Sequence, residues 1–168
     1  MKIGICPGSF DPVTMGHLDI ISRSRKIFDH VIVAVMINPA KKTLFTVEER
    51  IELLKRATAD MDHIEVVGFE GLLADFARLR GATAVIKGLR AVTDFEYEFQ
   101  QDLTNKKLNP DFETIFMSTI SEHMFLSSSI VKQIAMFGGD ISNFVPACIV
   151  EDVKKRICED KNGRPSAE

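Results

Sequence analysis

Residues 3–17 read Ile-Gly-Ile-Cys-Pro-Gly-Ser-Phe-Asp-Pro-Val-Thr-Met-Gly-His, and this stretch gives the first evidence on the fold. The apolar run Ile3–Cys6 predicts a short β-strand, which Pro7-Gly8 ends with a tight turn. Apolar residues at helical spacing then predict a helix over Gly16–Phe28. A strand, a loop and a helix in this order are typical of α/β proteins. The free N–H groups at the start of such a helix suit a phosphate.

The rest of the chain repeats this alternation. Further apolar runs predict strands at Val31–Met36, Ile64–Val67, Thr83–Lys87 and Thr114–Met117. Helical patterns predict helices over Thr46–Met61, Leu72–Arg80, Thr93–Asn109, Ser128–Phe137 and Pro146–Cys158. We therefore expect an α/β fold, a five-stranded parallel sheet with helices on both faces, built as one domain over residues 1–160. Residues 161–168 are polar and are expected to be a frayed tail.

Helix-start signals strengthen two of these predictions. Thr46 followed by Glu49, and Thr93 followed by Glu96, fit the capping-box pattern in which two side chains and two backbone N–H groups bond reciprocally. Gly81 predicts a left-handed stop for the helix before it.

Composition bounds the function. The chain has 168 residues, of which 45% are hydrophobic and 27% charged, and its net charge is −3. That balance suits one globular domain, without the basic excess of a nucleic-acid binder. No apolar stretch approaches the roughly 18 residues of a membrane span. The cysteines Cys6, Cys148 and Cys158 are widely spaced, and we interpret them as reduced thiols in a cytosolic protein.

The candidate site follows from the sheet. In open parallel sheets, ligands bind beyond the carboxyl ends of the strands, where the strand order reverses. Basic and hydroxyl side chains follow the predicted strands there: Lys41-Lys42, Lys87, Arg90 and Ser127–Ser129. Each has an ordinary alternative. In these alternatives, the lysine pair would be a solvated charge pair in a loop, and the serines would only cap a helix. Lys87 and Arg90 would cap the end of a strand or pair with Asp94, and Glu98 would belong to an exposed acidic helix face.

Two motifs narrow the choice. Thr14-Met-Gly-His17 resembles the T/H-x-G-H signature of the nucleotidyltransferase superfamily, and residues 126–132, Leu-Ser-Ser-Ser-Ile-Val-Lys, resemble its I-S-S-S/T-x-x-R/K signature. The stretches NPAKKTLFT at 38–46, FEGLLADFA at 69–77 and KGLRAVTDFEYE at 87–98 lie between them. With these, the chain resembles the phosphopantetheine adenylyltransferase family from about residue 2 to residue 150.

That resemblance implies a Rossmann-like nucleotidyltransferase fold and a function. The function is transfer of an adenylyl group from ATP to 4′-phosphopantetheine, giving dephospho-coenzyme A and pyrophosphate in coenzyme A biosynthesis. It implies Mg²⁺ carried on the ATP phosphates without side-chain ligands, a cytoplasmic homohexamer, and coenzyme A as a feedback ligand. It implies neither a nucleic-acid partner nor a membrane partner.

The resemblance also implies roles for particular residues. His17 and Lys41 are the expected catalytic residues. Ser9, Lys41, Leu73 and Lys87 are expected to bind phosphopantetheine. The expected ATP-binding residues are Ser9, Phe10, His17, Gly88, Leu89, Arg90, Glu98, His123, Met124, Phe125, Leu126, Ser127, Ser128 and Ser129.

The chain departs from the family pattern at three positions. Met15 stands where the family often has Asn, His123 where it often has Trp, and Lys87 where it often has Arg. Two competing enzyme classes share the two signatures: nicotinamide-nucleotide adenylyltransferases and cytidylyltransferases. A third alternative is a nucleotide-binding module that kept the fold and lost the chemistry, which the intact His17, Lys41 and Ser127–Ser129 disfavour. The chain has no G-x-G-x-x-G after its first strand and no G-x-x-x-x-G-K-[ST], which disfavours a dinucleotide-dependent oxidoreductase and a P-loop kinase.

Overall fold

The computed structural model of the chain describes residues 1–37 and 42–162. Its strands are β1 (Ile3–Gly8), β2 (His30–Met36), β3 (Ile64–Phe69), β4 (Ala84–Leu89) and β5 (Glu113–Ser118). Its α-helices are α1 (Met15–Ser24), α2 (Val47–Ala57), α3 (Leu73–Arg80), α4 (Val92–Leu108), α5 (Ser128–Met136) and α6 (Val150–Asn162). Two short 3-10 helices, η1 (Ser121–His123) and η2 (Ala147–Ile149), precede α5 and α6.

The strands form one sheet in the order β3-β2-β1-β4-β5, and every pairing is parallel. Ile5 of β1 pairs with Ile32 on one side and with Val85 on the other, so β1 lies at the centre. From β1 the chain builds outward through β2 to β3, and then crosses back to β4 and β5. The strand order therefore reverses between β1 and β4, which is where such sheets bind ligands. The predicted five-stranded parallel sheet is confirmed.

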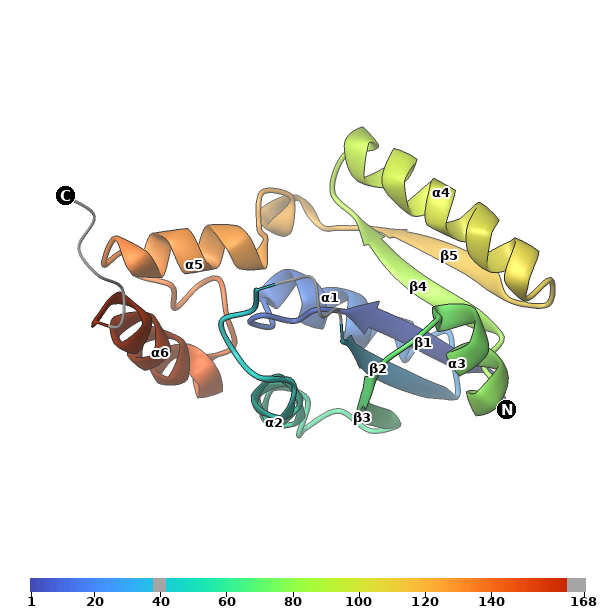
Figure 1. Ribbon diagram of the computed structural model, residues 1–168, viewed down its shortest axis with the longest axis horizontal. Helices are drawn as coiled ribbons and strands as arrows, with labels where there is room; N and C mark the ends of the chain where they lie inside the picture. Colours follow the sequence, from blue (N-terminus) through green and yellow to red (C-terminus); the bar gives the residue numbers. More distant parts are fainter. Residues whose placement is uncertain (38–41, 163–168) are drawn as a thin grey trace.

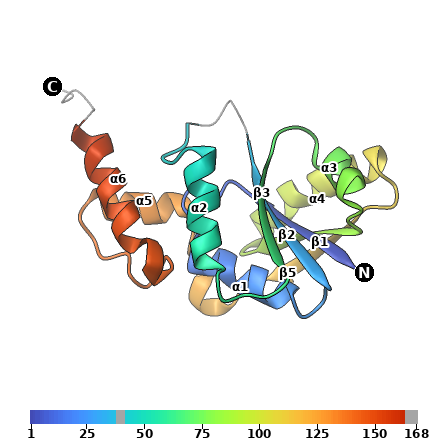
Figure 2. The ribbon, with the colours of Figure 1, turned by 90° about the horizontal axis from the view of Figure 1, so that it is seen from below.

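Helices cover both faces of the sheet, as predicted (Figure 1). The larger core cluster joins side chains of β2, including Val31, Val33 and Val35, to α1, α2, α5 and α6. The smaller cluster joins Ile5, Ile32 and Val85 to α3. In Figures 1 and 2, α5 and α6 lie together at one end of the molecule, while α3 and α4 lie at the other.

The buried strands explain the strength of the sequence signal. Val31, Val33, Ala34 and Val35 of β2 have 0% of their surface exposed. A strand with both faces covered has no polar side, so its sequence is an unbroken apolar run.

Capping was predicted correctly for α2 and wrongly for α4. Thr46 and Glu49 form the expected capping box, with Thr46 N–H donating to Glu49 at 2.8 Å. The residue that caps α4 is Ala91, with no side-chain cap bond, so the predicted Thr93 box is wrong. The helix begins earlier because the carboxylate of Asp94 accepts from the backbone N–H of Arg90 at 3.2 Å.

Helix ends also differ from the predictions. The first helix stops at Ser24 instead of Phe28, and the backbone bonds that follow, from Lys26 to Arg23 and from Ile27 to Ser24, span three residues in a tighter turn. Phe28 still packs in the larger core. The last helix extends to Asn162, beyond the predicted Cys158. Within the described residues, no helix combines the length and apolar character needed to cross a membrane.

Candidate active site

A cavity of about 460 Å³ opens at the point where the strand order reverses. Its floor comes from the carboxyl ends of β1 and β4, including Cys6 and Ile86, and its walls come from α1, α4, η1 and the first turn of α5. Gly88 makes this junction compact: a Cβ atom there would lie 2.9 Å from Ile20 Cγ1, so α1 can cross close to β4 only because residue 88 has no side chain.

Two helix N-termini meet in this cavity. Gly16 and His17 open α1, and Ser127 and Ser128 open α5, and all four residues line the cavity. Backbone N–H groups at a helix start are free of helical partners and carry a partial positive charge. Two such ends facing one space provide a site for a chain of phosphates.

His17 is held as a neutral donor. Its Nδ1 accepts a hydrogen bond from the backbone N–H of Thr14 at 3.0 Å, and the Thr14 hydroxyl caps α1 by accepting from His17 N–H at 3.4 Å. Because Nδ1 is an acceptor, the neutral ring carries its proton on Nε2. Burial, with the nearby positive charge of Arg90, lowers the pKa of His17 to about 4. The imidazole is therefore uncharged at neutral pH.

The cations Lys87, near the end of β4, and Arg90, just after it, are paired with carboxylates of α4. Lys87 Nζ lies 3.0 Å from Glu98 Oε2, and both side chains are about one-fifth exposed. Arg90 binds Asp94 through two guanidinium nitrogens, at 3.0 and 3.2 Å. Asp94 and Glu98 are one helical turn apart and both line the cavity.

Arg90 also connects α4 to the second signature, because its Nη1 donates to the Leu126 carbonyl at 3.1 Å. Burial of the Asp94 carboxyl acts to raise its pKa, but the hydrogen bonds from Arg90 outweigh burial, and the pKa lies below its usual value. Asp94 is thus an anion that fixes the direction of the guanidinium. The alternative in which Arg90 pairs with Asp94 is correct, and that pair lies in the cavity wall.

Two serines of the second signature form different side-chain hydrogen bonds. Ser127 caps α5 by accepting from Ile130 N–H at 3.2 Å, which agrees with the alternative in which a serine here caps the helix. The Ser128 hydroxyl donates to the Pro12 carbonyl at 2.7 Å and joins α5 to the loop after β1. Their backbone N–H groups remain part of the helix start.

The loop after β1 has a strained and buried turn. Phe10 has a φ of 48°, in the left-handed region, and only 4% of its surface is exposed. Its ring meets the His17 ring edge-on at 5.0 Å and so fixes the imidazole plane. The Ser9 carbonyl accepts from the buried Arg50 side chain at 2.8 Å.

The structure brings together many of the predicted residues, but not all. Those that line the cavity are Phe10, His17, Lys87, Gly88, Arg90, Glu98, His123, Leu126, Ser127 and Ser128. Those that do not are Ser9, Leu73, Leu89, Met124, Phe125 and Ser129. Leu73 begins α3 and packs in the smaller core cluster. Lys41 lies outside the described residues. The individual roles stay predictions.

Sequence reasoning missed several lining residues. Asp94, Tyr97 and Thr119 reach the cavity from α4 and from the end of β5, and no motif had marked Thr119. The i, i+4 spacing of Asp94 and Glu98 places both on one helix face, and the alternative that this face is exposed is wrong for these two residues, which line the cavity. Cys6 also lines the cavity, but burial raises its pKa to about 12, so it stays a thiol and is no nucleophile. All three cysteines are free, as expected.

A bound cation would find few ligands here. The described residues contain no cluster of three His, Cys, Asp or Glu side chains that could hold a metal ion. The cavity carboxylates Asp94 and Glu98 are already paired with cations.

Comparison with known proteins identifies the class and then the family. Residues 5–134 match the cytidylyltransferase-like family, so the fold and the site belong to a nucleotidyltransferase. A crystal structure titled as a putative nicotinate-nucleotide adenylyltransferase from Vibrio parahaemolyticus shares the fold. Its TM-score is 0.68 at 18% identity, covering 95% of this chain and 94% of that one.

The sequence relatives are more specific. Phosphopantetheine adenylyltransferase of Caldanaerobacter subterraneus subsp. tengcongensis is 56% identical over 157 residues, covering 94% of this chain and 98% of that protein. The enzyme of the same name from Clostridium tetani is 54% identical over 156 residues, covering 93% and 98%. That of Heliobacterium modesticaldum is 48% identical over 164 residues, covering 98% of each. The chain belongs to the phosphopantetheine adenylyltransferase family.

Proposed function

We propose that this protein transfers the adenylyl group of ATP to 4′-phosphopantetheine, giving dephospho-coenzyme A and pyrophosphate in coenzyme A biosynthesis. The observation that carries the proposal is the convergence of two helix N-termini and the neutral His17 on one cavity, in a chain of this family. Phosphate is the common chemistry of both substrates, and the site is built from phosphate-binding elements.

The chemistry needs no general base, because the nucleophile is already an oxyanion. A phosphate oxygen of phosphopantetheine attacks the α-phosphorus of ATP. A new P–O bond forms as the bond to the bridging oxygen breaks, and pyrophosphate leaves with that electron pair. Catalysis then consists of positioning and charge stabilisation. The Nε2–H of His17, with the N–H groups at the starts of α1 and α5, would donate to the α-phosphate as negative charge builds on it.

Lys87 and Arg90 differ in how they would meet a substrate. The fork of Arg90 is held by Asp94 and by the Leu126 carbonyl, so it offers a fixed charge beside the nucleotide. Lys87 has the single partner Glu98 within the contacts described, and a lysine ammonium turns freely about its stem. We assign Lys87 to the incoming phosphate of phosphopantetheine and Arg90 to the nucleotide.

We further propose that Mg²⁺ enters as part of the MgATP substrate. The donor set of the cavity supports this, since its carboxylates are held by Lys87 and Arg90 and form no cage for a hard cation.

A substrate comparison tests the proposed reaction. The protein is given MgATP with phosphopantetheine, nicotinamide mononucleotide or glycerol 3-phosphate, and pyrophosphate release is followed. We expect release with phosphopantetheine only. Release with nicotinamide mononucleotide or glycerol 3-phosphate alone would assign the chain to a different specificity, and no release with any acceptor would support a non-catalytic module.

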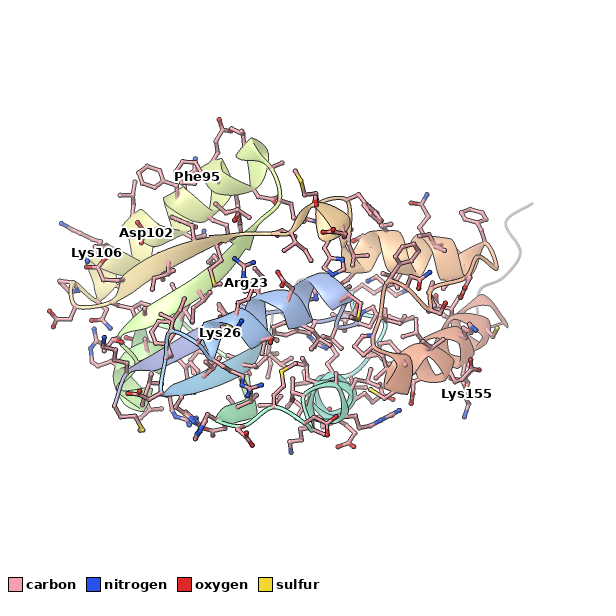
Figure 3. All side chains as sticks on the ribbon, turned by 180° about the vertical axis from the view of Figure 1, so that it is seen from behind. Arg23, Lys26, Phe95, Asp102, Lys106 and Lys155 are labelled. Atoms are coloured by element: carbon pink, nitrogen blue, oxygen red, sulfur yellow. The ribbon has the colours of Figure 1, made fainter. Side chains whose placement is uncertain are left out.

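We also propose a closed homo-oligomer of six subunits, and α4 supports it. The helix presents Asp94 and Glu98 to the cavity and leaves several apolar side chains exposed, although the Phe95 ring also contacts Phe116 of β5 at 5.4 Å. Its exposed apolar residues are Val92 at 76%, Phe95 at 41%, Phe99 at 43%, Leu103 at 56% and Leu108 at 43%. Figure 3 shows Phe95, Asp102 and Lys106 along this helix. Exposed apolar faces of this kind mark interfaces.

Sedimentation tests the assembly. We expect the wild-type chain to sediment as a hexamer at micromolar concentration and Leu103→Glu on α4 to shift it toward smaller species. Leu79→Glu on α3, where the leucine is 78% exposed, is the matched control and should leave the mass unchanged. A wild-type monomer would contradict the proposal.

Two remaining parts of the proposal concern regulation and location. Coenzyme A contains the whole dephospho-coenzyme A product, so it would occupy the same cavity as a feedback ligand competing with both substrates. Inhibition by coenzyme A that rising ATP relieves would support the feedback role.

We place the enzyme in the cytoplasm, where ATP is supplied.

A further inference from the structure

The loop after β1 and the helix α5 are joined at one dipeptide, Asp11-Pro12. Ser128 of α5 donates to the Pro12 carbonyl at 2.7 Å. One helical turn further along α5, Lys132 Nζ lies 2.8 Å from Asp11 Oδ2. The two α5 side chains are four residues apart, so they project from one face of the helix and hold adjacent residues of the loop.

Asp11 is held from a second direction. Its carboxylate accepts from the backbone N–H of Leu44 at 2.9 Å and from that of Phe45 at 2.9 Å. Among the described residues, Asp11 and Arg50 are the charged side chains classed as buried, at 4% and 3% exposure. Both join the loop after β1 to residues 44–46, since Arg50 donates to the carbonyls of Ser9 and Thr46.

A buried carboxylate of this kind depends on its cation. Ionised side chains are tolerated in a protein interior only when they are paired and hydrogen-bonded. The side chain of Asp11 is 6% exposed, and Lys132 supplies its positive partner. If Lys132 moved to a substrate phosphate, it would leave a buried anion held by two amides alone.

Lys132 is also absent from the lining of the substrate cavity. Ser127 and Ser128 of α5 line that cavity, and Lys132 does not. Yet Lys132 occupies the basic position of the second signature, residues 126–132, where a phosphate ligand would be the simple assumption.

We infer that Lys132 is a positioning residue. It holds the first turn of α5 against the loop after β1 through Asp11, and it does not bind the phosphates of ATP. This inference rests on the proposed function. Its effect is to set the separation between the two helix starts that face the cavity, so that His17 and the Ser127–Ser128 N–H groups reach the same phosphate chain.

The two possible roles of Lys132 predict opposite changes in ATP affinity for the substitution Asp11→Asn. If Lys132 binds ATP, then Asp11→Asn removes a competitor for the ammonium and tightens ATP binding. If Lys132 acts through Asp11, then Asp11→Asn and Lys132→Met remove the same contact, so each weakens ATP binding and lowers kcat. The expected loss in kcat is about tenfold or more, because small displacements of reacting groups are costly.

The experiment measures the ATP dissociation constant by calorimetry and kcat with phosphopantetheine for the wild type, both single variants and the double variant. We expect the double variant to be no worse than the more severe single variant, because both changes break one link. Lys155→Met, which removes a lysine 79% exposed on α6, is the charge-matched control and should change neither quantity. Tighter ATP binding in Asp11→Asn, or losses that multiply in the double variant, would overturn the inference.

A measurement on the wild type decides the question if Asp11→Asn does not fold. The 13C chemical shift of the Asp11 carboxyl is followed as ATP is added. We expect it to stay unchanged at saturation, and a change matching that seen in Lys132→Met would show that the lysine leaves Asp11 for the phosphates. If ATP binds but phosphopantetheine yields no pyrophosphate, the proposed function fails while these binding results still decide the role of Lys132. Absence of ATP binding to the wild type would overturn both.

Discussion

The helices α1 and α4 both flank the cavity, but different kinds of interaction hold them in place. Helix α1 has a complete capping box and buries Ile20, Ile21 and Ser24. Helix α4 has no side-chain cap bond and presents Asp94 and Glu98 to the protein. Burial of apolar surface therefore fixes α1, while ion pairs to β4 contribute to the placement of α4.

The difference separates two tasks within one site. In the proposed mechanism, the core holds His17 in place, because a preorganised donor must not move during the reaction. The proposed substrate-binding groups, Lys87 and Arg90, are paired with α4, whose apolar residues include several exposed ones. On the proposed assembly, a neighbouring subunit would complete the hold on α4 and so connect oligomerisation to the substrate side of the cavity.

A matched pair of truncations tests this contrast most strongly. Ile21→Ala on α1 removes a side chain that is 1% exposed, and the expected loss is about 2–5 kcal/mol of unfolding free energy. Leu103→Ala on α4 removes one that is 56% exposed, and the expected change is within about 0.5 kcal/mol. Urea unfolding, under conditions where the chain sediments as a monomer, measures both. Equal losses would mean that α4 is held by packing after all.

Removal of the His17 donor has the next largest effect. His17→Ala should lower kcat by about 10²-fold or more, the scale for loss of one preorganised donor. ATP binding should weaken much less, because the helix starts still hold the phosphates. Steady-state kinetics and ATP calorimetry separate the two. A variant with nearly normal kcat would remove His17 from the catalytic machinery.

Lys87 tests the α4 side of the site. Lys87→Ala should weaken use of phosphopantetheine by about 1.5–3 kcal/mol, the range for a hydrogen bond to a charged group, and spare ATP. Lys87→Arg should stay within about tenfold of the wild type, because the charge is kept. Varying each substrate in turn measures this. Lys26→Ala, which removes an exposed lysine after α1, is the control. A raised KM for ATP alone would move Lys87 to the nucleotide.

The smallest expected effect is that His17 does not titrate near neutral pH. Free histidine side chains titrate near pH 6.5, so protonation of an unfolded chain would rise below that pH. With a folded pKa of about 4, His17 should remain neutral from pH 8 down to about pH 5. It therefore stabilises the fold above pH 6.5, and that contribution is lost as the pH falls toward 4. A nitrogen NMR titration of the ring checks this, and a midpoint near 6.5 would contradict the burial of the ring beside Arg90.

The sequence by itself determined the architecture and the chemical class. Unbroken apolar runs such as Val31–Met36 occur because buried parallel strands have no polar face, so their pattern is local and readable. The Thr46 capping box and the Thr14–His17 signature were equally local, since each joins residues three apart. The resemblance to a family then supplied the reaction, which no periodicity could have given.

Only the tertiary structure decided which side chains meet. The pairing of Lys87 with Glu98, the entry of Thr119 into the cavity and the hold of Lys132 on Asp11 join residues that are 11 or more positions apart or lie on different elements. The Thr93 capping box failed for a local reason, because the backbone N–H of Arg90, four residues before Asp94 and just after β4, donates to the Asp94 carboxylate, and α4 begins earlier. Local patterns record what a segment prefers. Burial and charge pairing across the fold determine which preference prevails, and they depend on neighbours that the chain brings together only when it folds.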